Sequence, residues 1–247
     1  RIKDFFVLSK PLIVALLLVT TYAGLVAGAK AWPSASLTFW TLLGGALAAA
    51  GSSALNQYID RELDKNMQRT AKRPLADGRL TASEGLSYGL ALCLVSYYVM
   101  AGFVNLLAAL LSLTGIFYYV IFYSVLLKKA TVQNIVIGGG AGAIPPMVGW
   151  AAATGHLGLA AWILFAIVFM WTPPDFWALA IVRMKDYEKA GVPMMPVVHG
   201  EEKTRRHILV YTIELFAVTL LLPVFNLAGT VYLISALVLG GFLLYAA

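Results

Sequence analysis

Long apolar segments separated by short polar connections occupy most of this chain. A membrane-spanning helix needs about 20 mostly apolar residues, and eight segments meet that requirement. They cover residues 11–29, 38–58, 84–102, 105–127, 133–153, 158–182, 208–226 and 229–247. The pattern therefore predicts an all-α polytopic membrane protein with eight visible transmembrane helices and no soluble domain.

The composition supports this prediction. Hydrophobic residues make up 60% of the chain and charged residues 12%, and the mean hydropathy is +0.81. Such values are typical of membrane proteins. The single cysteine, Cys93, excludes an internal disulfide and a cysteine metal cluster. The chain begins without Met and ends inside an apolar run, so we expect both ends to be trimmed.

The basic residues indicate an orientation in the membrane. Connections on one side are long and charged, at 59–83 and 183–207, whereas those on the other side are short. All Lys and Arg residues except Lys30 lie at the N-terminus, in these two loops or at 128–129. Cytoplasmic loops carry an excess of Lys and Arg, so the N-terminus and both long loops are predicted to be cytoplasmic. The net charge of +6 then reflects topology and not nucleic-acid binding.

The loops also suggest an internal repeat. The second and the sixth predicted spans each lead into one of the long charged loops. Residues 1–247 are therefore predicted to form one domain of two four-helix halves, about 1–127 and 128–247, around a central cavity. A multi-pass protein of a bacterial or archaeal plasma membrane fits this pattern.

Three oxygen-bearing side chains lie at the end of the second span. Asn56, Asp60 and Asp64 are spaced four residues apart, which puts them on one face of a helix. Mg²⁺ prefers such hard oxygen ligands and usually completes its shell with water and phosphate oxygens. Lys72 and Arg73 follow and suit the same phosphate. On spacing alone, a solvated charged helix end explains the pattern equally well.

Polar residues elsewhere offer further candidates. Asp175 lies within the sixth span, where polar groups are expensive and usually functional, although a packing pair with a basic neighbour is the alternative. Pro173 and Pro174 are expected to break or kink that helix. Asn134 is either a loop or cap amide or a donor to the cavity. The glycines at 138–142 are expected to permit close helix packing.

Several segments together resemble the UbiA superfamily of intramembrane prenyltransferases, and within it the protoheme IX farnesyltransferase (heme O synthase) family. The spacing of Asn56, Asp60 and Asp64 is similar to the first aspartate-rich motif of the superfamily. The segments that resemble the heme branch are 8–11, 56–64, 72–75, 78–79, 128–134, 137–150, 171–174, 186–187 and 191–197. Of these, 131–150 and 171–197 are the most specific to that branch.

The resemblance implies transfer of a farnesyl group from farnesyl diphosphate to a vinyl group of heme B, within the lipid bilayer. It implies Mg²⁺ held by Asn56, Asp60, Asp64 and Asp186. Catalytic roles are implied for Asp60, Asp64, Asp186 and Asp175. Substrate binding is implied for Asn56, Lys10, Lys72, Arg73, Lys128, Asn134, Arg183, Lys185 and Tyr187. Enzymes of heme A synthesis or cytochrome oxidase assembly are suggested as partners.

The chain departs from the family pattern at three places. Asp175 stands where the family usually has His, and Leu12 where it commonly has Arg. Family members usually have a ninth helix, so we expect one to be missing here. Two other functions stay open: a relative that prenylates a quinone ring or another lipid, and a membrane transporter of heme or lipid without catalysis.

Overall fold

The computed structural model describes residues 1–128 and 130–247, and this part of the chain consists of helices and their connections. Lys129, which belongs to the predicted basic side, lies outside the described residues. The helices are α1 (Ile2–Leu8), α2 (Pro11–Ala29), α3 (Ala35–Lys65), α4 (Ala82–Phe103), α5 (Leu106–Phe117), the π-helix η1 (Tyr118–Leu127), α6 (Asn134–Gly138), α7 (Gly140–Thr154), α8 (Leu159–Val182), α9 (Met184–Lys189), α10 (Met195–His199), α11 (Glu201–Thr219), α12 (Leu221–Val224) and α13 (Thr230–Ala246).

Within the described residues, seven helical segments are long and apolar enough to cross a membrane. They are Pro11–Ala29, Ala35–Lys65, Ala82–Phe103, Leu106–Leu127, Asn134–Thr154, Leu159–Val182 and Glu201–Val224. The eighth predicted span corresponds to α13, a shorter apolar helix of 17 residues. The protein is thus an all-α, multi-pass integral membrane protein.

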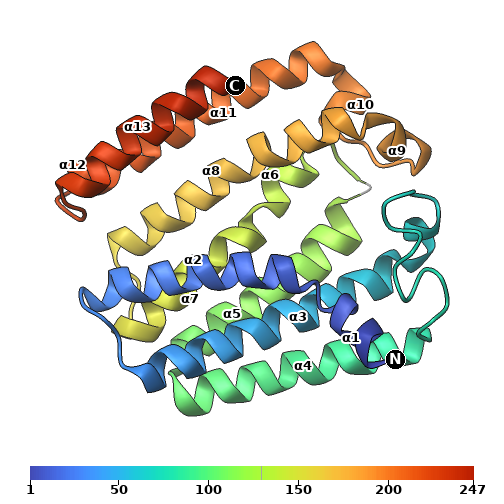
Figure 1. Cartoon of the computed structure of the whole chain (residues 1–247), viewed down its shortest axis with the longest axis horizontal. Helices are drawn as coiled ribbons and strands as arrows, with labels where there is room; N and C mark the ends of the chain where they lie inside the picture. Colours follow the sequence, from blue (N-terminus) through green and yellow to red (C-terminus); the bar gives the residue numbers. More distant parts are fainter. Residues whose placement is uncertain (129) are drawn as a thin grey trace.

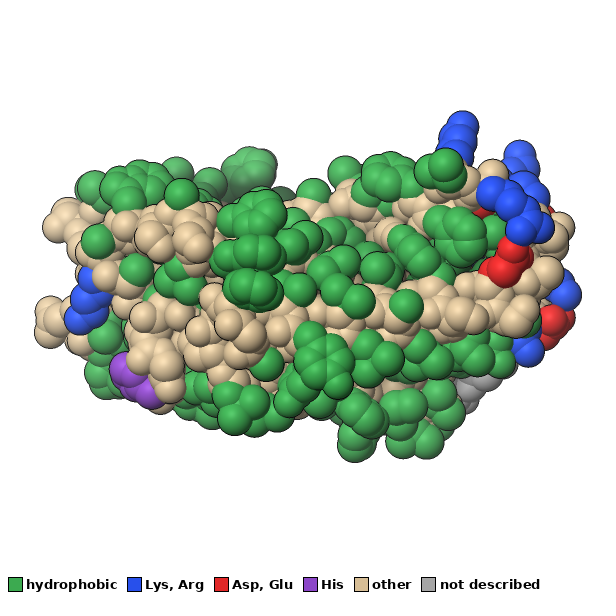
Figure 2. All heavy atoms as spheres, turned by 90° about the horizontal axis from the view of Figure 1, so that it is seen from below, with side chains coloured by type: hydrophobic (Ala, Val, Ile, Leu, Met, Phe, Trp, Pro, Cys, Tyr) green, Lys and Arg blue, Asp and Glu red, His purple; other side chains and the backbone are tan. Residues whose placement is uncertain are grey.

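The long helices run side by side, so that the loops collect at two ends (Figure 1). The most extensive helix pairs are α3 with α4, α2 with α7, and α8 with α11. Almost all charged side chains in view lie at one end, next to a broad hydrophobic middle (Figure 2). A hydrophobic band of this kind suits the hydrocarbon core of a bilayer.

Helices α2 and α7 approach each other through glycine. A Cβ atom added to Gly149 would lie 1.8 Å from the Thr21 carbonyl oxygen, and one added to Gly24 would lie 2.0 Å from the Pro146 carbonyl oxygen. Small residues at membrane helix interfaces let backbones come this close. The absence of a side chain at Gly24 and Gly149 therefore allows α7 to pack closely against α2.

Among the glycines at 138–142, some pack closely against the π-helix η1. Their predicted role in close helix packing is therefore confirmed for part of the run. An added Cβ would lie 2.3 Å from the Tyr123 ring at Gly138 and 3.1 Å from the Tyr118 ring at Gly140. At Gly142 it would meet nothing within 4 Å.

The structure corrects two local predictions. Helix α8 continues through Pro173 and Pro174, so the prolines do not break it. The segment 183–207, predicted as a loop, folds into α9, α10 and the first turns of α11. Its apolar residues Val192, Met194 and Met195 are buried. Burial of these side chains orders a segment whose charges suggested a solvated loop.

Candidate active site

Helix α3 carries a buried row of polar side chains near its end. Asn56, Asp60 and Asp64 are 3%, 4% and 2% exposed. The helix continues to Lys65, so its regular turns put all three residues on one face. Buried carboxylates are costly unless they are paired, so the partners of this row define the site.

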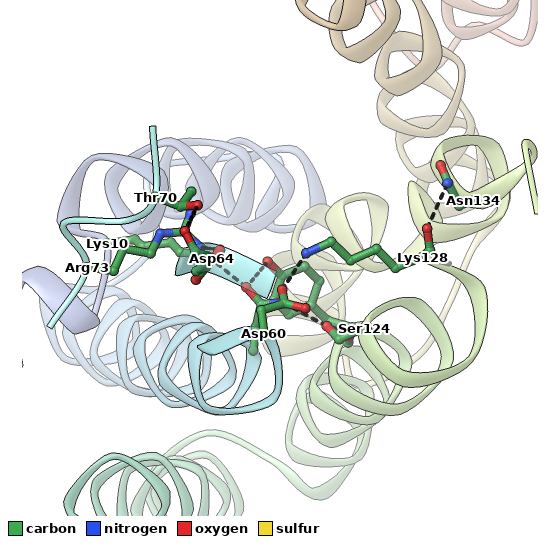
Figure 3. Close-up of polar contacts among 10 residues, drawn as sticks. Lys10, Asp60, Asp64, Thr70, Arg73, Ser124, Lys128 and Asn134 are labelled. Carbon is green, nitrogen blue, oxygen red and sulfur yellow. Dashed lines mark hydrogen bonds and ion pairs between the residues drawn. The ribbon is translucent and has the colours of Figure 1, made fainter. Parts of the chain in front are cut away.

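Three basic residues from distant segments supply these partners (Figure 3). Arg73 Nη1 donates to both Asp64 oxygens, at 2.9 and 2.7 Å. Lys128 donates to Asp60 Oδ2, and Lys10 Nζ donates to Asn56 Oδ1 at 3.0 Å. With all three basic side chains protonated and both carboxylates ionised, the cluster has a formal charge of +1, which favours an anionic ligand.

The backbone at Lys10 is unusual. Lys10 adopts the left-handed conformation, with φ 50° and ψ 63°, immediately before Pro11. This conformation costs free energy for a residue other than glycine and is found where the surrounding structure enforces it. Gln57 Nε2 donates to the Leu8 carbonyl at 2.7 Å and ties this corner to α3. Burial and the nearby Arg73 and Lys128 lower the pKa of Lys10 to about 7.

The amide of Asn56 is held by the π-helix, a contact that the sequence did not indicate. Asn56 Nδ2 donates to Asp60 Oδ2 at 2.8 Å and to Ser124 Oγ at 2.9 Å. The Tyr119 hydroxyl donates to Asn56 Oδ1 at 3.3 Å. Tyr119 and Ser124 are five residues apart, a spacing that shares a face on a π-helix but not on an α-helix.

Asn134 forms a hydrogen bond to the backbone of Lys128. Its Nδ2 donates to the Lys128 carbonyl at 3.2 Å (Figure 3). Asn134 is 1% exposed, and its Oδ1 has no hydrogen-bond partner among the described residues. Lys72, in contrast, is exposed, and its carbonyl accepts a hydrogen bond from Arg79 Nη2 at 2.7 Å.

The second group of predicted residues lies on α9. Tyr187 is buried in one hydrophobic cluster with Leu63 of α3 and Met67, so α9 belongs to the packed region at the end of α3. No hydrogen bond or ion pair within residues 1–128 and 130–247 joins Asp186 to Asp60 or Asp64, and no three Asp, Glu, His or Cys side chains there come close enough to hold a metal. Arg183 and Lys185 are exposed. The structure assembles Asn56, Asp60 and Asp64, and a shared set with Asp186 stays a prediction.

Asp175 stands apart from both groups. Its side chain is exposed on α8, and in the described part of the chain it makes no hydrogen bond or ion pair. The alternative for Asp175, a packing pair with a basic neighbour, is therefore not formed among the described residues.

Comparison with known proteins gives the family. Residues 17–247 match the model of the UbiA prenyltransferase family. The chain belongs to this family. It is 50% identical over 246 residues to the protoheme IX farnesyltransferase of Roseiflexus sp. (strain RS-1), covering all of this chain and 46% of that protein. It is 49% identical over 246 residues to that of Gloeobacter violaceus, covering all of this chain and 81% of that protein.

The chain thus spans about half the length of the Roseiflexus relatives.

Solved UbiA structures share its fold. A UbiA homolog from Archaeoglobus fulgidus bound to GPP and Mg²⁺ superposes with a TM-score of 0.74 at 18% identity, over 98% of this chain and 84% of that one. A digeranylgeranylglyceryl phosphate synthase gives 0.82 at 17% identity, over 99% and 85%.

The oxygen atoms of this site are ligands of the kind that a hard divalent cation such as Mg²⁺ prefers. Asn56, Asp60 and Asp64 present one amide and two carboxylates on a single buried face. Asp60 Oδ1 has no hydrogen bond to a described residue, since Lys128 and Asn56 both contact Oδ2. An oxygen ligand is therefore available without breaking the Asp60 contacts.

Proposed function

We propose that this chain transfers a farnesyl group from farnesyl diphosphate to a vinyl group of heme B, which yields heme O. The observation that carries the proposal is about 50% identity along the whole chain to protoheme IX farnesyltransferases. The buried cluster of two carboxylates and three cations supports it, because ionisation of an allylic diphosphate needs positive charge around the leaving group.

In this mechanism the basic residues act on the diphosphate. Arg73, Lys128 and Lys10 donate hydrogen bonds to its oxygens and stabilise the negative charge that grows as the C–O bond breaks. Mg²⁺ bound by Asn56, Asp60 and Asp64, with Asp186 as a further ligand, would neutralise part of the same charge. Lys72, the exposed neighbour of Arg73 in the sequence, adds positive charge to the same region.

The apolar bundle governs the fate of the farnesyl cation. Apolar helices exclude water from the cation until the heme vinyl group attacks it. Water then adds to the resulting porphyrin-side carbocation and loses a proton to solvent, which gives the hydroxyethylfarnesyl product. Asn134 and Tyr187, which lie near Lys128 and the end of α3 respectively, are proposed to bind substrate.

The membrane arrangement follows from the same proposal. We propose that α13 completes eight spans in two four-helix halves around a central cavity. The charged end, with both active-site groups, would face the cytoplasm of a bacterial or archaeal plasma membrane. Enzymes of heme A synthesis or of cytochrome oxidase assembly would then receive the product.

Product analysis tests the function. Purified protein in detergent would be given labelled farnesyl diphosphate and Mg²⁺ with heme B, with a quinone-ring precursor, or with no acceptor. Farnesylated heme as the main product is expected. Prenylation of the quinone ring alone would indicate a different acceptor, and no covalent product in any arm would indicate a transporter.

Arg73 provides a prediction about the donor. Arg73→Ala is expected to raise the dissociation constant of farnesyl diphosphate by roughly tenfold, because a charge-assisted hydrogen bond is worth about 1.5–3 kcal/mol. The dissociation constant of heme should change less than about twofold. Both constants can be measured by titration.

Two further variants make the Arg73 result interpretable. Arg73→Lys keeps the charge and should fall between wild type and Arg73→Ala. Lys65→Ala, which removes only an exposed pair with Glu62, should bind both ligands normally. If Arg73→Ala weakened the binding of farnesyl diphosphate and of heme equally, the cause would be a disrupted fold, because Asp64 would be buried without its partner.

Asp175 provides a prediction about the acceptor. We propose that it adds an oxygen near the porphyrin without ligating the iron, for which an imidazole is the better partner. Asp175→Ala should lower heme farnesylation by roughly fivefold, as expected for loss of one polar contact of about 1 kcal/mol. Asp175→His should retain or raise it. An unchanged rate and heme absorption spectrum in Asp175→Ala would contradict this role.

A further inference from the structure

A polar cavity lies where α8 passes into α9, and none of the hydrogen-bonded residues on α3 lines it. Its volume is about 390 Å³. Gln68, Arg183 and Lys185 supply hydrogen-bond donors to it, and Asp186 is the one acidic lining residue among those described. The lining thus has a formal charge of +1 and favours an anion.

The two cations of this cavity are not engaged elsewhere in the described part of the chain. Neither the Arg183 nor the Lys185 side chain makes an ion pair or a hydrogen bond there. Lys10, Arg73 and Lys128, in contrast, all contact the polar row of α3. The protein therefore has two basic groups with different surroundings: one is paired with the polar row of α3, and the other has no side-chain partner among the described residues.

The cavity continues into an apolar surface. Ile181 and Val182 line it as well, and Val182 is 78% exposed at the end of a membrane-spanning helix. Donors on one edge and exposed apolar side chains on the other fit an amphiphile with an anionic head and an apolar body. Such a ligand can enter from the bilayer and keep its head at the interface.

The exposed face of α8 extends from this cavity toward Asp175. Asp175 and Val182 are seven residues apart, so they lie on nearly the same face of the helix. Trp171 and Leu179 are exposed on that face too. A flat apolar ligand held at Arg183 would lie along this face, with Asp175 about 12 Å further along the helix axis.

We propose that Gln68, Arg183 and Lys185 bind the propionate carboxylates of the acceptor heme, while Lys10, Arg73 and Lys128 bind the donor diphosphate. This inference rests on the proposed function, since it names where the acceptor is held. A guanidinium fork matches a carboxylate in two parallel hydrogen bonds, and a nearby ammonium suits the second carboxylate. The heme ring then extends over α8 into the apolar layer.

Wild-type protein alone gives the first test. Heme B and its dimethyl ester, in which both carboxylates are masked, would be titrated spectrophotometrically without farnesyl diphosphate. The acid is expected to bind roughly tenfold or more tightly than the ester, because charge-assisted hydrogen bonds are lost in the ester. Equal affinity for the two would overturn the proposal, whatever the enzymatic activity of the preparation.

The double variant Arg183→Gln and Lys185→Gln assigns the effect to these residues. It should bind heme B roughly tenfold more weakly and no longer distinguish the acid from the ester. The KM for farnesyl diphosphate should stay within about twofold. Lys189→Gln, which removes one charge from the same helix α9 outside the cavity lining, is the matched control and should behave as wild type.

Other outcomes overturn the assignment. A raised KM for farnesyl diphosphate with unchanged heme affinity would show that Arg183 and Lys185 bind the diphosphate and not the heme. Retained discrimination in the double variant would move the carboxylate site elsewhere. If the double variant does not fold, Gln68→Leu and Lys185→Gln are measured singly, and retained discrimination in both would overturn the proposal. If heme binds as expected but no farnesylated product forms, the proposed function fails and the binding site remains.

Discussion

Asp60→Ala and Asp64→Ala are each expected to abolish prenyl transfer, with a fall in rate of about 10³-fold or more. Loss of a single group that stabilises transition-state charge costs about 10²–10³-fold. Each carboxylate also holds a cation that the mechanism requires, Lys128 or Arg73. The rate of farnesyl transfer to heme B, measured as a function of Mg²⁺ concentration, checks this expectation.

Both variants should still fold. The Lys128 and Arg73 side chains are 16% and 19% exposed, so either cation can reach water when its partner is removed. Asp60→Asn and Asp64→Asn keep the side-chain volume and serve as second variants, with folding followed by thermal melting in detergent. Glu62→Ala removes an exposed carboxylate from the same helix, one paired only with Lys65 and Arg61, and should keep wild-type activity.

One result would contradict the assignment of Asp60 and Asp64 as metal ligands. If either alanine variant keeps its transfer rate and its Mg²⁺ dependence, the polar row on α3 does not hold the metal. Loss of activity in Glu62→Ala as well would show that any change near the end of α3 is damaging.

Gly149→Ala is expected to prevent folding or to destabilise the protein by about 3 kcal/mol or more. The added Cβ would lie 1.8 Å from the Thr21 carbonyl oxygen and 2.7 Å from the Leu25 nitrogen. Both are backbone atoms, so no change of rotamer relieves the clash and α2 must move away from α7. Overpacking a core commonly costs 1–3 kcal/mol and occasionally more. Thermal melting and the monomeric fraction after extraction measure the effect.

A glycine on the same helix supplies the matched control. A Cβ at Gly142 would meet nothing within 4 Å. Gly142→Ala should therefore leave stability unchanged or raise it by up to about 1 kcal/mol, because Ala has the higher helix propensity. A wild-type melting temperature for Gly149→Ala would contradict the close packing of α2 on α7.

The sequence predicted the scaffold well because apolar length and helical spacing are local properties. The second predicted span ended at residue 58, whereas α3 runs to Lys65 and carries Asp60 and Asp64 on the same face as Asn56. The i, i+4 spacing predicts that face directly. The 17 residues of α13 show the limit of this reasoning, since length alone does not establish a span.

The rest of the site depends on contacts between distant segments. Lys10 and Lys128 reach α3 from residues 46 and 68 positions away, and only the resemblance to a family suggested them. Tyr119 and Ser124 were missed because their shared face exists only on a π-helix. The ordered helices α9 and α10 were missed because charge in 183–207 suggested a solvated loop, whereas buried Val192 and Met194 decide its fold.

A structure with farnesyl thiodiphosphate, which ionises slowly, and Mg²⁺ would show where the diphosphate and the metal bind. We expect the diphosphate to lie within hydrogen-bond distance of Arg73 and Lys128, with the metal on Asp60 and Asp64. A diphosphate bound instead at Arg183 and Lys185, with Asp60 and Asp64 still paired only to their cations, would contradict this expectation.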